Sequence, residues 1–474
     1  MNVEREKIWA NWKVESGQKL VDPMTFESIV EKDQEPRSPM WRSRGDLMPA
    51  PRLIPYDRYY DPKYVDLEVE HIWNKMWQVA CRAEDIPNIG DRLNYDIVDR
   101  SYLIVRTGEN EFKAFYNSCR HRGRKLCEEK GSGEKIRCPF HGWEYRLDGQ
   151  LHWVPLEQEF PHVDPKRNSL IPVKTGVWGG NVFINPDPQA PPLETALAPM
   201  ADQYKGYPIE ERYTAIRIFV DVGCNWKAAQ EAFNEGYHVL QTHADGMPMF
   251  GSVGTQVENF GDGLGLVSRL ITPGMTTDHW LQGQVKPHEG LILYCQAYGL
   301  PLPPPERGND PVDARKYAAE MQRKRIEANT GKDWSNEPTS YFIDMGKYFL
   351  FPNHHPWWGE GLPWWYNFKP LGRNPETSQM EIRVLLPIPA SGERPPVPEA
   401  YHVHIGERCE EKYPELGSTA HLIDQDLTNM YAVQLGFKAA APGAGYLTLA
   451  QNHESMIRRF HNIYDDLLGI TPQL

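Results

Sequence analysis

The chain has 474 residues, with 64 acidic and 51 basic side chains and a formal net charge of −13. This length allows two or three domains with sizeable cores, and the acidic balance gives no electrostatic footprint for nucleic acid. No apolar run approaches membrane-spanning length, the polar first residues do not resemble a signal peptide, and 7 cysteines are too sparse for a secreted disulfide scaffold. We therefore expect a protein of the reducing cytoplasm.

Three stretches of the chain differ in their expected structure. We expect an N-terminal helical arm over residues 1–75 that packs on the C-terminal domain, a small all-β domain over 76–190, and a larger domain over 191–474. The arm ends in a helix, because Asp61 suits an N-cap and Pro62 a first helical position. Apolar residues at helical spacing give this helix one buried face: Val65, Val69, Ile72 and Met76.

The middle stretch is expected to form short strands joined by turns. Residues 102–106 and 112–117 have strand composition, and the segment between them is typical of a turn. The larger C-terminal stretch mixes longer strands with helices. The expected strands are residues 213–222, 364–370 and 380–387, and the expected helices lie near 226–241, 418–437 and 451–468. Residues 300–337 are interpreted as an insertion, Pro-rich at first and then helical and charged; its role is left open, with a cover over the active-site mouth as one candidate.

Four candidate metal ligands lie close together in the middle stretch. Cys119 and His121 form one short arm, and Cys138 and His141 form a second. Each arm lets two side chains of one loop converge on a point. Thiolates with imidazoles suit zinc, or a [2Fe-2S] cluster in which two His replace two Cys on one iron, so the ligand types alone leave both open. The other cysteines are expected to be small buried apolar residues: Cys81, Cys127, Cys224, Cys295 and Cys409.

The residues around the two arms favour the cluster. Pro139, Gly142 and Trp143 adjoin the second arm. A zinc knuckle has no need of them, whereas a redox cluster needs small residues that let N–H groups approach its sulfurs, and an apolar cover. The two arms with these neighbours closely resemble the cluster-binding motif of the Rieske non-haem iron oxygenases, the family of aromatic ring-hydroxylating dioxygenase alpha subunits. The resemblance implies that the four residues bind a Rieske [2Fe-2S] cluster.

A second group of candidate ligands follows the Asn225-Trp226-Lys227 segment. His238 and His243 are five residues apart, which separates them by about 140° on an α-helix. Both could bind one metal only if the helix bulges or unwinds, and we predict such an irregularity between Val239 and Thr242. Glu235 lies three residues before His238, so it shares a helix face with it and is placed to accept a hydrogen bond from its imidazole.

In the family that this chain resembles, a segment that begins Asn-Trp-Lys and ends in two spaced His carries two ligands of a mononuclear iron. The resemblance therefore implies that His238 and His243 bind iron. It also implies that Glu235 bridges to the cluster of a neighbouring subunit. Many members have Asp at that position, and Glu is one methylene longer. No role is carried over to Ala232, where many members have Asn.

A carboxylate is needed to complete a 2-His-1-carboxylate site. The best candidate is Asp426, because its spacing to the following Val-Gln-x-Gly pattern resembles the ligand helix of the family; Asp424 is the second candidate. His354 and His355 are adjacent and cannot easily reach one ion, so we interpret them as structural or pocket-lining. Residues 454–461 are assigned to packing.

The resemblance implies an α+β fold, with an all-β Rieske domain and a catalytic domain in which a curved antiparallel sheet surrounds a long helix (helix-grip or START-like). It also implies a trimer in which the cluster of one chain lies near the iron of the next, with or without a small beta subunit. The chain has no dinucleotide fingerprint, so electrons from NAD(P)H must come through a partner reductase, with or without a ferredoxin. The basic residues near the cluster are candidates for docking it: Arg120, Arg122, Arg124 and Lys125.

The implied activity is that of a terminal oxygenase (EC 1.14 class), which dihydroxylates or hydroxylates a hydrophobic, and in particular an aromatic, substrate with O2, as in aromatic hydrocarbon catabolism. The candidate pocket is apolar and includes Phe233, Val239, Leu240, Met247, Met249 and Phe250. Two tryptophan-rich runs, at 356–358 and 363–366, either line the pocket or belong to strand packing or a subunit interface. One alternative is a monooxygenase or demethylase for methoxylated aromatic or quaternary ammonium compounds. Another is a Rieske electron carrier without catalysis.

Overall fold

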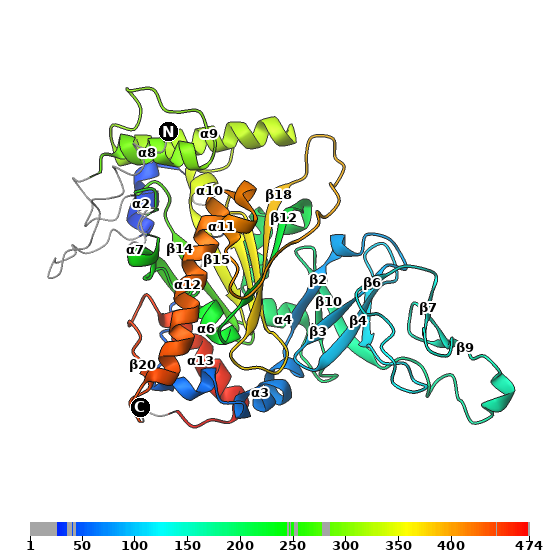
Figure 1. Cartoon of the computed structure of the whole chain (residues 1–474). Coiled ribbons are helices and arrows are strands. Elements are labelled where there is room, and N and C mark those ends of the chain that lie inside the picture. Colours follow the sequence, from blue (N-terminus) through cyan, green and yellow to red (C-terminus); the bar gives the residue numbers. More distant parts are fainter. Residues whose placement is uncertain are drawn as a thin grey trace.

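A computed structural model describes residues 26–35, 40, 44–243, 246, 248–250, 255–276, 285–441 and 443–472. Figure 1 shows two β-rich parts side by side. A seven-stranded and a three-stranded sheet are built from the middle stretch, and an eight-stranded sheet, covered by helices, from the C-terminal stretch. The expected α+β class is confirmed.

The N-terminal arm lies on the C-terminal part of the chain. Its elements are α2 (Phe26–Asp33), β1 (Ile54–Pro55), η2 (Tyr56–Tyr59), α3 (Lys63–Glu68) and η3 (Val69–Trp73). β1 pairs with β20 (Tyr446–Leu447), which joins the N-terminal arm to the C-terminal part of the chain. The expected helix is present as α3 and η3, and the side chain of Asp61 accepts a hydrogen bond from the backbone N–H of Lys63 (3.0 Å). The apolar face expected from its spacing is buried.

The middle stretch forms a sheet with the order β2-β11-β10-β5-β4-β3-β6. Its strands are β2 (Gln78–Arg82), β3 (Arg92–Ile97), β4 (Arg100–Arg106), β5 (Phe112–Tyr116), β6 (Lys130–Gly131), β10 (Pro172–Trp178) and β11 (Asn181–Asn185), and η4 (Ala83–Asp85) follows β2. A small sheet, β7-β8-β9, stands beside it, formed by β7 (Lys135–Arg137), β8 (Glu144–Arg146) and β9 (Leu151–Trp153), with η5 (Glu157–Glu159) after it. The two strands expected near 102–106 and 112–117 are confirmed.

Strand β4 explains why the central sequence of this sheet is apolar on both faces. Tyr102 and Ile104 point into the large core shared with the rest of the molecule, whereas Leu103 and Val105 point into a smaller core. Successive side chains of a strand face opposite sides, so a strand between two cores reads as a continuous apolar run. The smaller core contains Cys119 and Cys138, so this sheet is the floor of the cysteine loops.

The C-terminal stretch forms a sheet with the order β13-β14-β15-β16-β17-β18-β12-β19. Its strands are β12 (Arg212–Val222), β13 (Gln256–Asn259), β14 (Val267–Thr272), β15 (Met345–Leu350), β16 (His354–Trp358), β17 (Trp364–Pro370), β18 (Ser378–Pro387) and β19 (Tyr401–Val403). The three expected strands of this region are confirmed as β12, β17 and β18. The sheet was expected to be antiparallel. It is not so throughout, because the short edge strand β19 runs parallel to β12.

Helices cover this sheet. The connection from the middle stretch contains α4 (Leu193–Leu197), α5 (Met200–Gln203), η6 (Tyr204–Gly206) and η7 (Ile209–Glu211), and the later helices are α6 (Trp226–Glu231), α7 (Val239–Thr242), α8 (Pro287–Ala297), α9 (Pro311–Thr330), α10 (Thr339–Ile343), α11 (Cys409–Lys412), η10 (Pro414–Leu416), α12 (Ser418–Ala439) and α13 (Ser455–Leu468). In Figure 1, α12 crosses the face of the sheet. The helices expected near 418–437 and 451–468 are confirmed, and in the part of the chain that the structure describes none is long and apolar enough to cross a membrane.

The segment interpreted as an insertion is an integral part of a helical layer. Residues 313–329 form most of α9, which packs against α8 and α10. Arg315 on α9 is buried and binds Asp33 of α2 (2.8 Å) and Asp344 (2.9 Å). The helix therefore ties the N-terminal arm to the C-terminal part.

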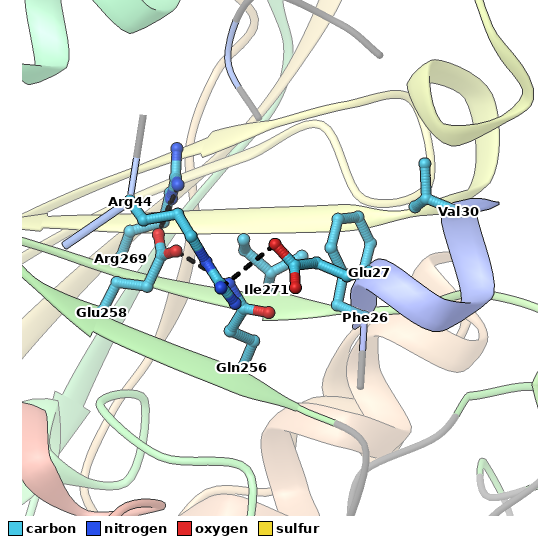
Figure 2. A pocket seen from close by; sticks show the side chains of 8 residues that line it. All are labelled: Phe26, Glu27, Val30, Arg44, Gln256, Glu258, Arg269 and Ile271. Atoms are coloured by element: carbon cyan, nitrogen blue, oxygen red, sulfur yellow. Dashed lines mark hydrogen bonds and ion pairs between the residues drawn. The ribbon is translucent and has the colours of Figure 1, made fainter. Parts of the chain in front are cut away.

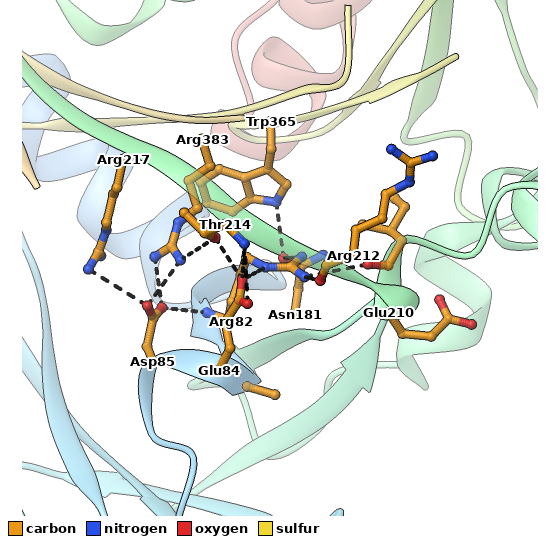
Figure 3. Close-up of polar contacts among 12 residues, drawn as sticks. Arg82, Glu84, Asp85, Asn181, Glu210, Arg212, Thr214, Arg217, Trp365 and Arg383 are labelled. Carbon is orange, nitrogen blue, oxygen red and sulfur yellow. Dashed lines mark hydrogen bonds and ion pairs between the residues drawn. The ribbon is translucent and has the colours of Figure 1, made fainter. Parts of the chain in front are cut away.

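Buried charges join the two β-rich parts (Figure 3). Asp85, which ends η4, binds both terminal nitrogens of Arg383 on β18 at 2.7 and 3.0 Å, and both side chains are 0% exposed. Beside them Glu84 accepts a hydrogen bond from the hydroxyl of Thr214 on β12 (2.6 Å), and the indole N–H of Trp365 donates to Asn181 (3.0 Å). Such paired charges hold two surfaces in one relative position, because each partner left alone would be an uncompensated buried charge.

Candidate redox and metal centres

The two cysteine arms have the same backbone conformation. The N–H of Gly123 donates to the carbonyl of Cys119 (2.9 Å), and the N–H of Gly142 donates to the carbonyl of Cys138 (3.0 Å). Each glycine has φ +77°, which is strained for other residues, so glycine is required four residues after each cysteine. Each cysteine N–H also donates to the carbonyl five residues later, at 2.8 Å. The two arms are thus matching loops, each of which presents one thiol and one imidazole.

The four side chains separate into a buried pair and an outer pair. Cys119 and Cys138 lie in the smaller core, and the rings of His121 and His141 meet edge to face, with centroids 4.5 Å apart. Burial, with a smaller effect of the adjacent Cys138 thiol, raises the pKa of Cys119. Donor atoms on one zinc ion lie within about 4 Å of each other. Among the described residues, no three of this quartet have donor atoms within 4.8 Å of each other, so the loops do not converge on one ion. Two thiols beside two imidazoles fit a two-iron cluster better.

Two aromatic residues support these loops through contacts that the sequence did not predict. The hydroxyl of Tyr145 accepts from the N–H of Arg120 (2.9 Å) and lies 3.3 Å from the sulfur of Cys119, within hydrogen-bond distance. Trp143 stacks on His121, with centroids 5.0 Å apart and planes 6° apart. These contacts orient one ligand of each kind. The remaining cysteines are buried and unpaired, as expected: Cys81, Cys127, Cys224, Cys295 and Cys409.

The helix that carries the second group of candidate ligands is broken, but not where the spacing predicted. The expected irregularity between Val239 and Thr242 is wrong, because those residues form the regular turn α7. The break lies earlier, between the end of α6 at Glu231 and His238. His243 then leaves the helix with φ −116° and ψ 40°. His243 reaches His238 because the chain turns at the end of α7, and a bulge within the helix is not needed.

His238, His243 and Asp426 converge on one point. Their donor atoms all lie within 4.8 Å of each other, and no other group of three or more such side chains in the described ranges does so. The Nε2 atoms of His238 and His243 lie 3.7 and 2.9 Å from one carboxylate oxygen of Asp426. Two imidazoles and one carboxylate are the donor set of a facial non-haem iron site, so the residues present fit that metal.

Each imidazole is oriented by a hydrogen bond at its other nitrogen. Nδ1 of His238 lies 2.5 Å from Glu235, and Nδ1 of His243 lies 2.7 Å from the side-chain oxygen of Gln425. With these hydrogens donated, both Nε2 lone pairs face Asp426. Gln425 was missed by the sequence, although it precedes Asp426 on α12. Asp424, the second candidate, instead caps α11 by accepting from the N–H groups of Cys409 (2.7 Å) and Glu410 (3.1 Å).

Glu235 is folded back onto its own loop. One of its oxygens accepts the hydrogen bond of the His238 ring, and the other accepts the backbone N–H groups of Tyr237 and His238. A carboxylate has about four acceptor positions. The three hydrogen bonds within the chain therefore leave room for about one more donor.

The candidate pocket residues are divided between two cores. Phe233 packs on one core, where its ring lies 5.0 Å from that of Tyr366. Phe250 packs on Tyr294 of α8 (6.3 Å), and both Phe250 and Met249 border the large core. Val239 and Leu240 are partly exposed on α7, and Met247 lies outside the described residues. The structure thus does not bring the predicted set together.

The tryptophans of the two runs point to opposite faces of the sheet, because successive side chains alternate along β16 and β17. Trp358 and Trp365 are fully buried in the large core. Trp357 and Trp364 are partly exposed on the opposite face, where their rings lie 5.8 and 5.5 Å from Tyr366. Burial, and then the carboxylate of Asp426, raise the pKa of Tyr366 well above its ordinary value. One half of the pairs therefore packs strands, and the other half forms an aromatic wall with Tyr366. That this wall lines a pocket stays a prediction.

Other features of the molecule do not belong to this site. His354 and His355 are buried in the sheet, as expected for structural residues, and His461 is buried against Glu231 (2.8 Å). Figure 2 shows a hollow between α2 and strands β13 and β14, lined by the ion pairs Glu27–Arg44 (3.1 Å) and Glu258–Arg269. None of the candidate metal ligands lines this hollow.

Comparison with known families agrees with both centres. The model of the Rieske [2Fe-2S] domain matches residues 76–167, and the model of the catalytic domain of the ring hydroxylating alpha subunit matches residues 209–470. The chain is a member of this alpha subunit family. The second model covers more than half of the sequence, and it includes His238, His243 and Asp426. A Rieske cluster and a non-haem iron are the cofactors that the family implies.

Alpha subunit relatives act on different substrates. The glycine betaine monooxygenase oxygenase subunit of Pseudomonas aeruginosa is 31% identical over 227 residues, which are 48% of this chain and 52% of the relative. The chlorobenzene dioxygenase subunit alpha of a Cupriavidus species is 31% identical over 199 residues, 40% and 44% of the two chains. The alignments thus span about half the length of these relatives.

Solved structures share the fold of this alpha subunit. A quaternary ammonium Rieske monooxygenase superposes with a TM-score of 0.61 at 17% identity, covering 88% of this chain and 95% of the other. A naphthalene 1,2-dioxygenase does so with a TM-score of 0.59 at 16% identity, covering 88% and 92%. The same fold thus occurs in proteins whose names give an aromatic or an aliphatic substrate.

Proposed function

We propose that this alpha subunit is the terminal oxygenase component of a multicomponent system that oxygenates a small organic substrate with O2. The observation that carries the proposal is the convergence of His238, His243 and Asp426 in a chain that also holds two matching Cys/His loops. When bound, a Rieske cluster supplies single electrons and a mononuclear iron supplies the activation of O2.

The protein's own side chains prepare the iron site. Glu235 and Gln425 hold the two imidazoles in the tautomer whose Nε2 atoms point to the metal. Tyr366 and the tryptophans behind it exclude water from the side next to Asp426. His238 remains partly exposed, which leaves one side of the site accessible to substrate.

Electrons are proposed to cross between chains of a trimer. In Figure 1 the strands beside the cysteine loops, β7 and β9, lie at the opposite end of the molecule from α7. His141 is exposed at that end, next to Phe140, which is 56% exposed. On the iron side Tyr237 and Tyr431 are exposed. These apolar surfaces suit a head-to-tail contact in which His141 of a second chain donates to the remaining acceptor position of Glu235.

The electron donor is proposed to be a reductase or ferredoxin that uses NAD(P)H. Of the basic residues near the cluster, Arg124 pairs with Glu128 (2.8 Å) and Lys125 with Asp96 (3.3 Å). Arg122 lies over the ring of Phe140 (5.5 Å), beside His141. Arg122 therefore belongs to the surface proposed for the contact between chains. Arg120, which is exposed and whose guanidinium contacts the carbonyl of Arg167 (3.5 Å), is the basic residue proposed to contact an acidic donor.

The substrate is proposed to be hydrophobic or aromatic, because the wall beside Asp426 consists of Phe233, Trp357, Trp364 and Tyr366. Such rings bury apolar surface and stack on planar ligands. The same wall supports a second candidate, a quaternary ammonium compound, because aromatic faces attract cations. The two acids of the site, Glu235 and Asp426, would add to that attraction.

Product analysis tests the activity. The reduced protein with both metal sites filled is expected to oxidise at least one member of a panel of aromatic hydrocarbons, methoxylated aromatics and quaternary amines, with O2 consumed in proportion to product. Mass spectrometry of products formed with ¹⁸O2 measures this. A dihydrodiol indicates dioxygenation, and loss of a methyl group as formaldehyde indicates monooxygenation. If no compound is oxidised while three irons and two sulfides per chain are present, the proposal is wrong; two irons and two sulfides per chain, without a third iron, would indicate an electron carrier.

Mixing of inactive variants tests transfer between chains. His141→Ala and His238→Ala chains are each expected to be inactive, whereas trimers reassembled from equal amounts should regain about a quarter of the wild-type rate, since one contact in four of a head-to-tail ring pairs an intact cluster with an intact iron site. A mixture of His141→Ala with Cys138→Ala chains, both defective at the cluster, is the control. No recovery in the first mixture, with trimers shown by light scattering, would place electron transfer within one chain.

A further inference from the structure

A buried lysine holds the turn that precedes the iron ligands. Lys347, on β15, is 1% exposed. Its ammonium contacts three acceptors: the carbonyl of Phe233, the side-chain oxygen of Asn234 (2.8 Å) and Nδ1 of His355 (3.3 Å). An ammonium has three N–H donors, so each of them has a partner. Two of these partners lie in the break between α6 and His238.

The register of the sheet places this lysine. Lys347 pairs with Trp357 across β15 and β16, and opposite residues of an antiparallel pair share a face. His355, two residues before Trp357, shares that face as well. Its other nitrogen lies 3.3 Å from the side-chain oxygen of Gln230 on α6. The lysine thus sits where the sheet, the end of α6 and the turn meet.

The charge of Lys347 has no ion-pair partner in its immediate surroundings. Among the described residues, no carboxylate oxygen lies within 4.0 Å of its nitrogen. Burial lowers its pKa well below the ordinary value, and the opposing effect comes from Glu235. Burying an ammonium is costly, and a methionine would fill the same space without that cost. A residue so expensive for stability points to a role in the conformation of the turn that it binds.

We propose that Lys347 is a positioning residue that fixes the Phe233–Asn234 turn, and through it Glu235 and His238, in the geometry that binds the mononuclear metal. The inference rests on the proposed function, since it assigns to Lys347 the shaping of that metal site. Asn234 is 0% exposed and directly precedes Glu235. Loss of the anchor would let the turn move while the cysteine loops, in the other part of the molecule, stay unchanged.

Metal affinity tests this inference. In protein with its cluster intact and the mononuclear iron removed by a chelator, Lys347→Met is expected to weaken Co²⁺ binding about 10- to 100-fold, as for other residues that orient metal ligands. The visible absorption of bound Co²⁺ should also change, because His238 is no longer held. Asn234→Leu should have an effect in the same direction, and the double variant should bind no more weakly than Lys347→Met, since both substitutions remove one anchor.

Lys369→Met is the matched control. Lys369 is a partly exposed lysine on β17, and its amine contacts the carbonyl of Asp96 (3.4 Å) and not the turn. Its replacement should leave Co²⁺ affinity and absorption unchanged. If Lys347→Met alters only the melting temperature and binds Co²⁺ as tightly as wild type, the inference is overturned. If wild type itself binds no Co²⁺ at His238, the proposed function fails instead.

Discussion

Replacing Asp426 with alanine is expected to empty the mononuclear site and to lower product formation by more than about 100-fold, because even residues that only support a metal ligand cost about 10- to 100-fold when they are removed. One oxygen of Asp426 lies within 3.7 Å of the Nε2 atoms of both His238 and His243. Without it, two neutral imidazoles remain, and the site loses its negative charge. Iron should fall from three to two atoms per chain, while sulfide and the Rieske spectrum stay constant.

Asp424 provides the control for this prediction, since it lies two residues away on the same helix. Its carboxylate caps α11, so Asp424→Ala should cost about 0.5–2 kcal/mol of stability and leave three irons in place. Metal and sulfide analysis of both variants decides between the two acids. Retention of the third iron in Asp426→Ala, or its loss in Asp424→Ala, would reverse the assignment.

Replacing Arg383 with methionine is expected to lower the free energy of unfolding by about 3–5 kcal/mol, because it leaves the Asp85 carboxylate buried without its partner. Although burial raises it, Arg383 and Arg217 hold the pKa of Asp85 below its ordinary value. A depressed folded-state pKa contributes stability above the unfolded value of about 3.9 that is lost as the pH falls further, so the comparison belongs at neutral pH.

Two further variants separate this pair from its surroundings. Replacing Arg217 with methionine should lower the free energy of unfolding by about 1 kcal/mol or less. Its side chain is 17% exposed and lies 3.7 Å from Asp85. The double variant Asp85→Leu/Arg383→Met removes both buried charges and should recover most of the stability. Urea unfolding is followed by cluster absorbance, which reports the part with the cysteine loops, and by tryptophan fluorescence, which reports both parts. If Arg217→Met and Arg383→Met lower the free energy of unfolding equally, the buried Asp85–Arg383 pair contributes no more than the partly exposed Arg217.

The sequence predicted those elements whose pattern is local. The apolar run around Leu103 indicated a strand, and the spacing of Val65 and Ile72 indicated a helix, because one turn or one pleat is enough to express those patterns. No local sequence pattern predicted the position of the break before His238. It is held by Lys347, more than a hundred residues later, whose contact with Asn234 no periodicity reveals.

In the candidate site, too, local sequence patterns were predictive and contacts between distant parts of the chain were not. The candidate ligands of the cysteine loops could be found from short spacings such as Cys138 to His141, whereas the resemblance to the oxygenase family indicated His238, His243 and Asp426. Some of the residues that orient them could not be found in either way. Tyr145 reaches the sulfur of Cys119, and Gln425 reaches His243, only after the chain has folded. Hydrogen-bond partners far apart in sequence carry no signal in composition or spacing.

The two matching loops have a consequence for how the cluster forms. Each loop carries one cysteine and one histidine, with its glycine at φ +77°. In a Rieske cluster the two Cys share one iron and the two His share the other. Each iron therefore needs one ligand from each loop, and a single loop does not provide a complete half-site. Insertion of such a cluster would therefore require both loops at once, and damage to either loop would release both irons together.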